Sequence, residues 1–197
     1  MGKNKLAKFE EMAAFEHVVQ APYHLVKQND FYLKGYWAEK FFKNTNPVIV
    51  ELGCGKGEYT VKLAEKNPNF NYIGVDIKGS RLFNGAKQAL NKNLKNVAFL
   101  RTNIEIVTQF FGAGEILEIW LTFPDPQMKK TRKRLTSTIF LNKYKQFLKN
   151  DGVIHLKTDS NFQYSYTAAL VKLNGLKVLF ETDNLYQSEL LNDTLRI

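Results

Sequence analysis

The chain has 197 residues, of which 44% are hydrophobic and 24% charged, a composition that argues against intrinsic disorder and favours one folded domain. Its 28 Lys and Arg against 19 Asp and Glu give a net charge of +9, which suits a polyanionic partner, with nucleic acid ahead of membrane. The single cysteine excludes an intramolecular disulfide and a cysteine-based metal cluster, and no apolar run approaches the ~18 residues of a membrane span.

The N-terminal segment MGKNKLAKF is not followed by the apolar region of a signal peptide. The three histidines lack the spacing of metal ligands. We therefore expect a cytoplasmic protein with neither a metal nor a membrane contact. Residues 1–30 are basic at the front and polar throughout, which predicts an arm, mobile or peripheral, with a short helix.

From residue 31 onward the pattern is that of strands alternating with helices. An apolar run at 47–57 predicts a buried strand that ends in a glycine turn. The further strands are expected at 71–77, 96–103, 116–126, 152–159 and 176–183. The helices are expected at 58–67, 80–94, 137–150 and 161–175. This alternation predicts an α/β domain over residues 31–197, with a mostly parallel, doubly wound sheet that binds its ligand at the carboxyl ends of the strands.

The first strand ends in the sequence ELGCGKG, in which Gly53, Gly55 and Gly57 allow a tight turn and a close approach of a ligand to the backbone. The spacing is G-x-G-x-G, not the G-x-G-x-x-G of dinucleotide-binding folds. Asp76 ends the second strand, where a carboxylate can accept both hydroxyls of a ribose. Each feature alone also fits a ligand-free turn or a helix cap, but together they favour a cofactor that contains adenosine.

Two further residues favour S-adenosylmethionine over NAD. Glu51 lies at the corner between strand and turn, where a carboxylate suits a cationic amino-acid group and works against a diphosphate. Asn103 follows the third strand and is placed to hydrogen-bond an adenine edge.

The most unusual segment is FPDPQMKKTRKR at residues 123–134. Asp125 stands between two prolines that narrow its backbone freedom, at the carboxyl end of the fourth strand. Five cations follow within six residues, and we expect them to hold nucleic acid phosphates: Lys129, Lys130, Arg132, Lys133 and Arg134. Asp159 ends the fifth strand on the same rim and is expected to face the same pocket as Asp125.

Taken in order, the motifs ELGCGKG, GVDIKGSR, TNIE, FPDPQMKK and KTDSNFQY resemble the bacterial tRNA (guanine-N7-)-methyltransferases, over roughly residues 30–197. The resemblance implies a Rossmann-like class I methyltransferase fold and methyl transfer from S-adenosylmethionine, released as S-adenosylhomocysteine, to the variable-loop guanine at tRNA position 46. It implies cofactor contacts from Glu51, Asp76, Asn103 and Asp125, with Asp125 also catalytic. It implies substrate contacts from Lys129 and Asp159.

The sequence also departs from this family. Gln127 stands where the family usually has Trp, and the block KKTRKR is shorter and lacks the family's histidine. The family's T-x-[YF]-E motif and last strand would begin where this sequence stops, which predicts a C-terminally truncated form that lacks the last antiparallel strand and is weak or inactive on tRNA.

Three other functions stay open from the sequence. They are a different S-adenosylmethionine-dependent N-methyltransferase acting on RNA or a small molecule, a non-catalytic RNA-binding module, and an NAD-dependent oxidoreductase. We expect a monomer or a homodimer.

Overall fold

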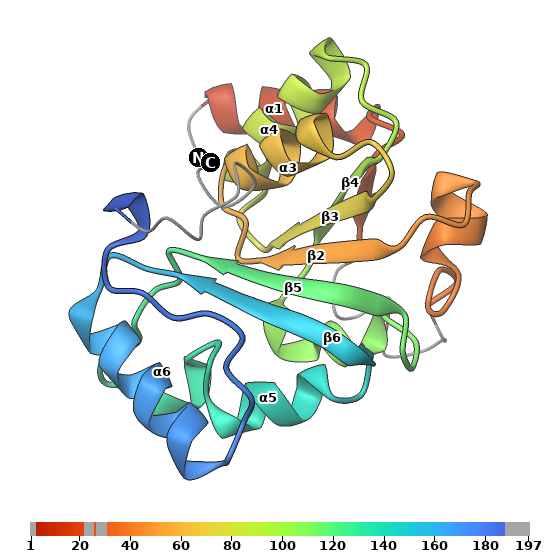
Figure 1. Ribbon diagram of the computed structural model, residues 1–197. Helices are drawn as coiled ribbons and strands as arrows, with labels where there is room; N and C mark the ends of the chain where they lie inside the picture. Colours follow the sequence, from red (N-terminus) through yellow and green to blue (C-terminus); the bar gives the residue numbers. More distant parts are fainter. Residues whose placement is uncertain (1–2, 22–25, 27–30, 188–197) are drawn as a thin grey trace.

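The computed structural model describes residues 3–21, 26 and 31–187, and its centre is one parallel sheet (Figure 1). Every strand pairing in this sheet is parallel. The strands pair in the order β1-β4-β3-β2-β5-β6. They are β1 (Val18–Gln20), β2 (Val48–Leu52), β3 (Asn71–Asp76), β4 (Val97–Arg101), β5 (Ile116–Thr122) and β6 (Leu148–Lys157). The predicted α/β fold with a parallel sheet is confirmed.

Helices cover both faces of the sheet. They are α1 (Lys3–Ala13), α3 (Glu58–Lys66), α4 (Gly79–Asn91), α5 (Thr138–Tyr144) and α6 (Asn161–Leu173). Shorter helical segments are η1 (Trp37–Phe42), η2 (Ile104–Gln109), η3 (Thr131–Lys133) and η4 (Leu185–Gln187). Figure 1 shows α1, α3 and α4 grouped on one side of the sheet and α5 and α6 on the other. Among the described residues, no helix combines the length and apolar character needed to span a membrane.

The strands are apolar because both of their faces are buried. Along β2, Val48, Val50 and Leu52 belong to one core cluster, whereas Ile49 belongs to the cluster under α3 and α4. Side chains of a strand alternate between faces, so a strand buried on both sides needs apolar residues at nearly every position. This requirement explains why the run around β2 is readable from sequence.

The chain order reverses between β2 and β5, which pair directly although β3 and β4 separate them in sequence. A crevice forms outside the carboxyl ends of a parallel sheet at such a reversal, because the connections on either side diverge to opposite faces. The glycine turn follows β2 and the Asp125 segment follows β5. The topology therefore brings these two segments to the same end of adjacent strands.

The short helix predicted within residues 1–30 is present as α1, but the prediction of a mobile or peripheral arm is wrong for the residues that the structure describes. Val18 to Gln20 form β1, which pairs with β4 at the edge of the sheet. Met12 is fully buried in the cluster under α1 and α4, and Glu11 forms a 2.9 Å ion pair with Lys87 on α4. A few buried apolar residues, among them Met12, Phe15 and Ala21, are enough to anchor this mostly polar segment. Residues 22–25 and 27–30 lie outside the described residues.

The prediction of a strand at 176–183 is also wrong. These residues have no strand pairing in the structure, and Leu176, Val178, Leu179 and Phe180 are exposed. An alternating pattern can fit a strand, but a strand also needs a neighbouring backbone to pair with. The predicted helix at 137–150 is shorter, since α5 ends at Tyr144 and β6 already begins at Leu148 to pair with Ile116.

Candidate active site

Glu51 lies at the end of β2 and is only 4% exposed. Its carboxylate accepts hydrogen bonds from the backbone N–H of Thr60 (2.9 Å) and from the hydroxyls of Thr60 and Thr122. Burial raises the pKa of Glu51 to about 7, against the three hydrogen bonds, which lower it. The carboxylate joins β2 to the start of α3 and to the end of β5, beneath the crevice rather than open to it.

The glycine turn is built from backbone groups that point back to β3. The N–H groups of Gly53 and Cys54 both donate to the carbonyl of Val75, at 2.8 and 3.1 Å. Gly53 and Gly55 have φ values of +81° and +56°, in the left-handed region that side chains disfavour. The turn thus requires glycine at these two positions, as expected from the sequence.

Two apolar side chains lie close to the bare backbone of the glycine turn. A Cβ added at Gly53 would lie 3.7 Å from Leu135 and 3.8 Å from Ile104, so two apolar side chains flank the bare backbone. Aliphatic side chains next to a bare backbone are typical of sites that bind a flat apolar ring. Neither Ile104 nor Leu135 was singled out in the sequence, because nothing local distinguishes them from other apolar residues.

The polar groups predicted to read the ribose and adenine stand at the ends of the next two strands. Asp76 ends β3, and its two oxygens accept the N–H groups of Gly55 (3.0 Å) and Lys78 (2.7 Å). Asn103 follows β4, and its Oδ1 accepts the Glu105 N–H at 3.0 Å as the cap of η2. Both side chains are therefore oriented by the backbone near the turn.

Asp125 occupies an exposed loop after β5 and is held by a local turn. Its Oδ1 accepts the N–H of Gln127 at 2.9 Å. Phe123 and Gln127, on either side of it, have φ values of +47° and +48°. Left-handed backbone at residues other than glycine costs of order 1–3 kcal/mol each and tends to occur at functional sites. Two such residues around one aspartate support a functional reason for its placement.

Aromatic rings and a cation that the sequence did not single out stand next to this loop. The rings of Phe123 and Tyr59 pack edge to face with centroids 6.1 Å apart. Lys157 Nζ lies 5.1 Å from the Tyr59 ring and 5.9 Å from the Phe123 ring, and its carbonyl accepts the Phe123 N–H at 2.7 Å. The last hydrogen bond ties the Asp125 loop to the end of β6, two residues before the exposed Asp159.

The five predicted phosphate-binding cations fall into three groups. Lys129, Lys130 and Arg132 are exposed, and none of them forms an ion pair with any described residue. Lys133 is exposed but pairs with Glu105 at 3.0 Å. Arg134 is 5% exposed, and its guanidinium is enclosed by protein, which argues against the predicted contact with substrate phosphates.

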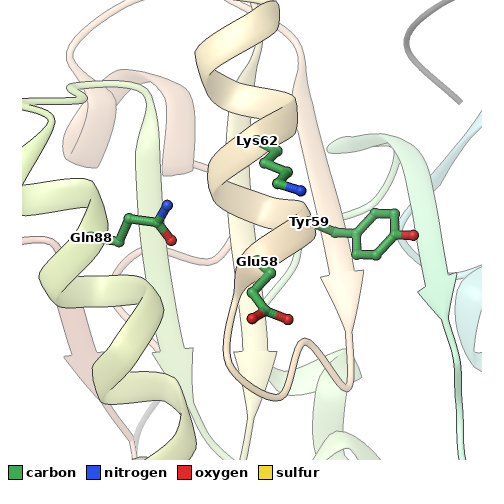
Figure 2. A pocket seen from close by; sticks show the side chains of 4 residues that line it. All are labelled: Glu58, Tyr59, Lys62 and Gln88. Carbon is green, nitrogen blue, oxygen red and sulfur yellow. The ribbon is translucent and has the colours of Figure 1, made fainter. Parts of the chain in front are cut away.

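A separate hollow of about 410 Å³ lies over α3 and α4 and is lined by Glu58, Tyr59, Lys62 and Gln88. Figure 2 shows Gln88 on α4 facing α3, with Tyr59 projecting to the other side of that helix. None of the four is a predicted cofactor residue, although Glu58 directly follows the glycine turn and the Tyr59 ring packs against Phe123 of the Asp125 loop. In the part of the chain that the structure describes, no three His, Cys, Asp or Glu side chains are grouped to hold a metal ion.

Comparison with known proteins agrees with this arrangement. Residues 45–195 match a family model described as "Putative methyltransferase". The chain is 57% identical over 197 residues to a tRNA (guanine-N(7)-)-methyltransferase of Bacteroides thetaiotaomicron, covering 100% of this chain and 78% of that protein. It is 52% identical over 189 residues to the enzyme of the same name from Christiangramia forsetii, covering 95% and 84%.

Among solved structures, the aminoglycoside resistance methyltransferase NpmB1 has a TM-score of 0.50 at 17% identity, covering 69% of this chain and 68% of that one. At this identity the likeness concerns the fold alone.

The buried Glu51 predicts a pH-dependent stability. Its folded pKa, near 7, lies above the ordinary 4.5, so its protonated form favours the folded state. That contribution is fully present below about pH 4.5 and is lost as the pH rises through about 7. Relative to Glu51→Gln, which cannot ionise, the wild type should lose up to about 3 kcal/mol of unfolding free energy between pH 5 and 8.5. Urea unfolding of both proteins at each pH measures this, and a difference independent of pH would contradict it.

Proposed function

This chain belongs to the tRNA (guanine-N(7)-)-methyltransferase family, and from that premise we propose that it transfers a methyl group from S-adenosylmethionine to N7 of guanine in tRNA. The variable-loop guanine at position 46 is the proposed target, and the cytoplasm the proposed compartment. One observation carries the proposal. Where the chain order reverses between β2 and β5, the glycine turn, the hydrogen-bonded Asp125 and the exposed cations follow adjacent strands.

The proposed cofactor residues have two kinds of role: some shape the glycine turn, and others contact the ligand. Asp76 and Asn103 are proposed to bind the ribose and the adenine, between the apolar walls formed by Ile104 and Leu135. The backbone of Gly53 and Gly55 allows the close approach. Glu51 is proposed to attract the cationic amino-acid end of the cofactor from beneath the turn, because a nearby positive charge favours the ionised form of a carboxyl whose pKa burial has raised to about 7. When bound, S-adenosylmethionine supplies an electrophilic methyl group on a sulfonium.

Guanine N7 already carries a lone pair in the neutral base, so this transfer needs no general base. The protein's contribution is positioning, which can supply up to ~7–11 kcal/mol in favourable cases. The purine gains positive charge as the methyl group arrives, and the fixed carboxylate of Asp125 is proposed to stabilise that charge. Asp159, at the end of the adjacent strand, is proposed to orient the base.

The exposed cations supply the sequence-independent part of tRNA affinity. Lys129, Lys130 and Arg132 project from the loop that carries Asp125, so phosphates bound there would lie beside the base being modified. Lys133 already neutralises Glu105, and its contribution to phosphate binding should be smaller. Because these cations and Asp125 lie on one loop, binding of the tRNA phosphates would also bring one guanine close to Asp125.

The proposed reaction is tested by incubating the protein with labelled methyl donor and unmodified tRNA transcript, then cleaving the product with borohydride and aniline. We expect cleavage at a single variable-loop guanine. A transcript made with 7-deazaguanosine, which lacks N7, should accept no methyl group. Label in the 7-deaza transcript would identify another acceptor atom, and cofactor binding without any transfer would favour an RNA-binding module.

Replacing Asp125 separates its charge from its turn. Asn can still accept the Gln127 N–H but carries no charge, so Asp125→Asn should keep the fold and lower turnover by about 10²- to 10³-fold. The matched control is Asp151→Ala, an exposed aspartate in the first half of β6, which should retain turnover. Turnover of Asp125→Asn close to wild type would remove the proposed electrostatic role.

The cations predict a salt dependence. Each phosphate contact adds about 0.7–0.9 to the log–log slope of affinity against salt, so the double variant Lys130→Ala, Arg132→Ala should flatten the slope by about 1.4–1.8. Filter binding of tRNA at salt concentrations from about 50 to about 300 mM measures this slope. Lys145→Ala, Lys149→Ala removes the same charge near the amino end of β6 and should leave the slope unchanged. Equal slopes for both double variants would exclude the loop cations from the interface.

A further inference from the structure

Arg134 is the one residue of the basic block 129–134 that the structure encloses. It is 5% exposed, although it directly follows three exposed residues of η3. An arginine is rarely this buried unless its donors and its ring-like face are both matched. The contacts around Arg134 meet both conditions.

On one side, the guanidinium closes the loop that follows Asp125. Its Nε donates to the carbonyl of Pro126 at 3.1 Å, and its Nη2 donates to the carbonyl of Met128 at 3.0 Å. These two carbonyls flank Gln127, the residue held at a φ of +48°. The fork of Arg134 therefore grips the backbone on both sides of the strained residue, one peptide away from Asp125.

On the other side, the guanidinium packs on α6. Its central carbon lies 4.7 Å from the Phe162 ring and 4.4 Å from the Tyr166 ring. Those two rings are themselves stacked, with centroids 6.4 Å apart and planes inclined by 18°. They belong to the first half of α6, whose N-cap is Ser160, the residue after Asp159.

The two carboxylates proposed to act on guanine thus follow neighbouring strands and meet a common support. Thr122 and Lys157 are paired at the ends of β5 and β6, and Asp125 and Asp159 follow three and two residues later. Beyond the last strand bond, the Arg134 side chain spans from the Asp125 loop to α6, the helix that Asp159 precedes. Loss of this link would leave the strained loop free to relax.

A role in holding tRNA phosphates does not fit these contacts. Phosphate needs donors that face solvent, whereas two nitrogens of Arg134 are committed to carbonyls and its faces lie against protein. We propose that Arg134 is a positioning residue for methyl transfer, which fixes the Asp125 loop on α6 and so sets the placement of Asp125 relative to Asp159. The proposal rests on the function proposed above.

The test compares Arg134→Lys with Arg101→Lys. Lysine keeps the charge but cannot bridge two carbonyls while stacking on two rings. Arg101 is the matched control. Its guanidinium also stacks on an aromatic ring, that of Phe9 (4.5 Å), and donates to Gln20 (2.8 Å). It lies on β4, which β3 and β2 separate from β5 and β6 in the sheet. We expect Arg134→Lys to lower kcat at saturating tRNA by about 10- to 100-fold, because small misplacements of reacting groups are costly, while tRNA Kd changes less than about 2-fold. Arg101→Lys should change neither.

A second readout needs no activity. Trypsin cleavage after Lys129 and Lys130, followed by mass spectrometry without tRNA, should be about 10-fold faster in Arg134→Lys, because the loop opens more often. Tyr166→Leu keeps the loop hydrogen bonds of Arg134 but removes one stacked ring, and should give a smaller change of the same sign in both readouts.

The outcomes separate the two proposals. Unchanged kcat with weakened tRNA binding in Arg134→Lys would make Arg134 a phosphate ligand, and unchanged trypsin cleavage would show that it does not hold the loop; either result overturns the inference. If the wild type transfers no methyl group to tRNA, the proposed function fails, and faster cleavage of the variant still supports the link from loop to helix.

Discussion

The arrangement of the site depends on one shared carboxylate. Glu51 is the next-to-last residue of β2, and its oxygens accept hydrogen bonds from Thr60 at the start of α3 and from Thr122 at the end of β5. A buried carboxylate without donors would cost several kcal/mol, so these three groups are held together by the need to satisfy it. The glycine turn and the Asp125 loop leave from either side of this point, and their relative placement follows from it.

Positive charge has two separate uses in the segment after β5. Lys129, Lys130 and Arg132 are exposed and can bind a polyanion. Arg134 is buried, where it donates to backbone carbonyls and stacks on aromatic rings. The same residue type in the same run therefore contributes affinity at one position and rigidity at another. Burial, which composition does not report, decides between the two.

Strain is concentrated where the chemistry is proposed. Phe123 and Gln127 keep left-handed backbone around Asp125, and contacts from outside the loop hold the chain at or beside each of them. Phe123 donates to Lys157 on β6, and Gln127 lies between the two carbonyls that Arg134 grips. Such a loop can hold one carboxylate in a fixed direction only while those outside contacts persist.

Much of this protein follows from local pattern. Apolar runs that end in glycine or aspartate identified β2, β3 and the turn, because a buried parallel strand must be apolar throughout and a tight turn must be glycine. The pattern also located Asp76, Asn103 and Asp125 at strand ends. It misjudged residues 176–183, where alternation was present but no neighbouring backbone paired. It also misjudged the described part of residues 1–30, where a few buried side chains outweighed a polar composition.

What the tertiary structure alone decided is which residues serve one another across the chain. Thr60 and Thr122 meet Glu51 from 9 and 71 residues away, and Phe162 and Tyr166 enclose Arg134 from α6, beyond α5 and β6 in the chain. The sequence itself gives the residue types, and the spacing of its apolar runs and glycines indicates where the strands end. The partners of a buried charge depend on strand order and on which face each helix covers, and those are properties of the folded sheet rather than of any segment within it.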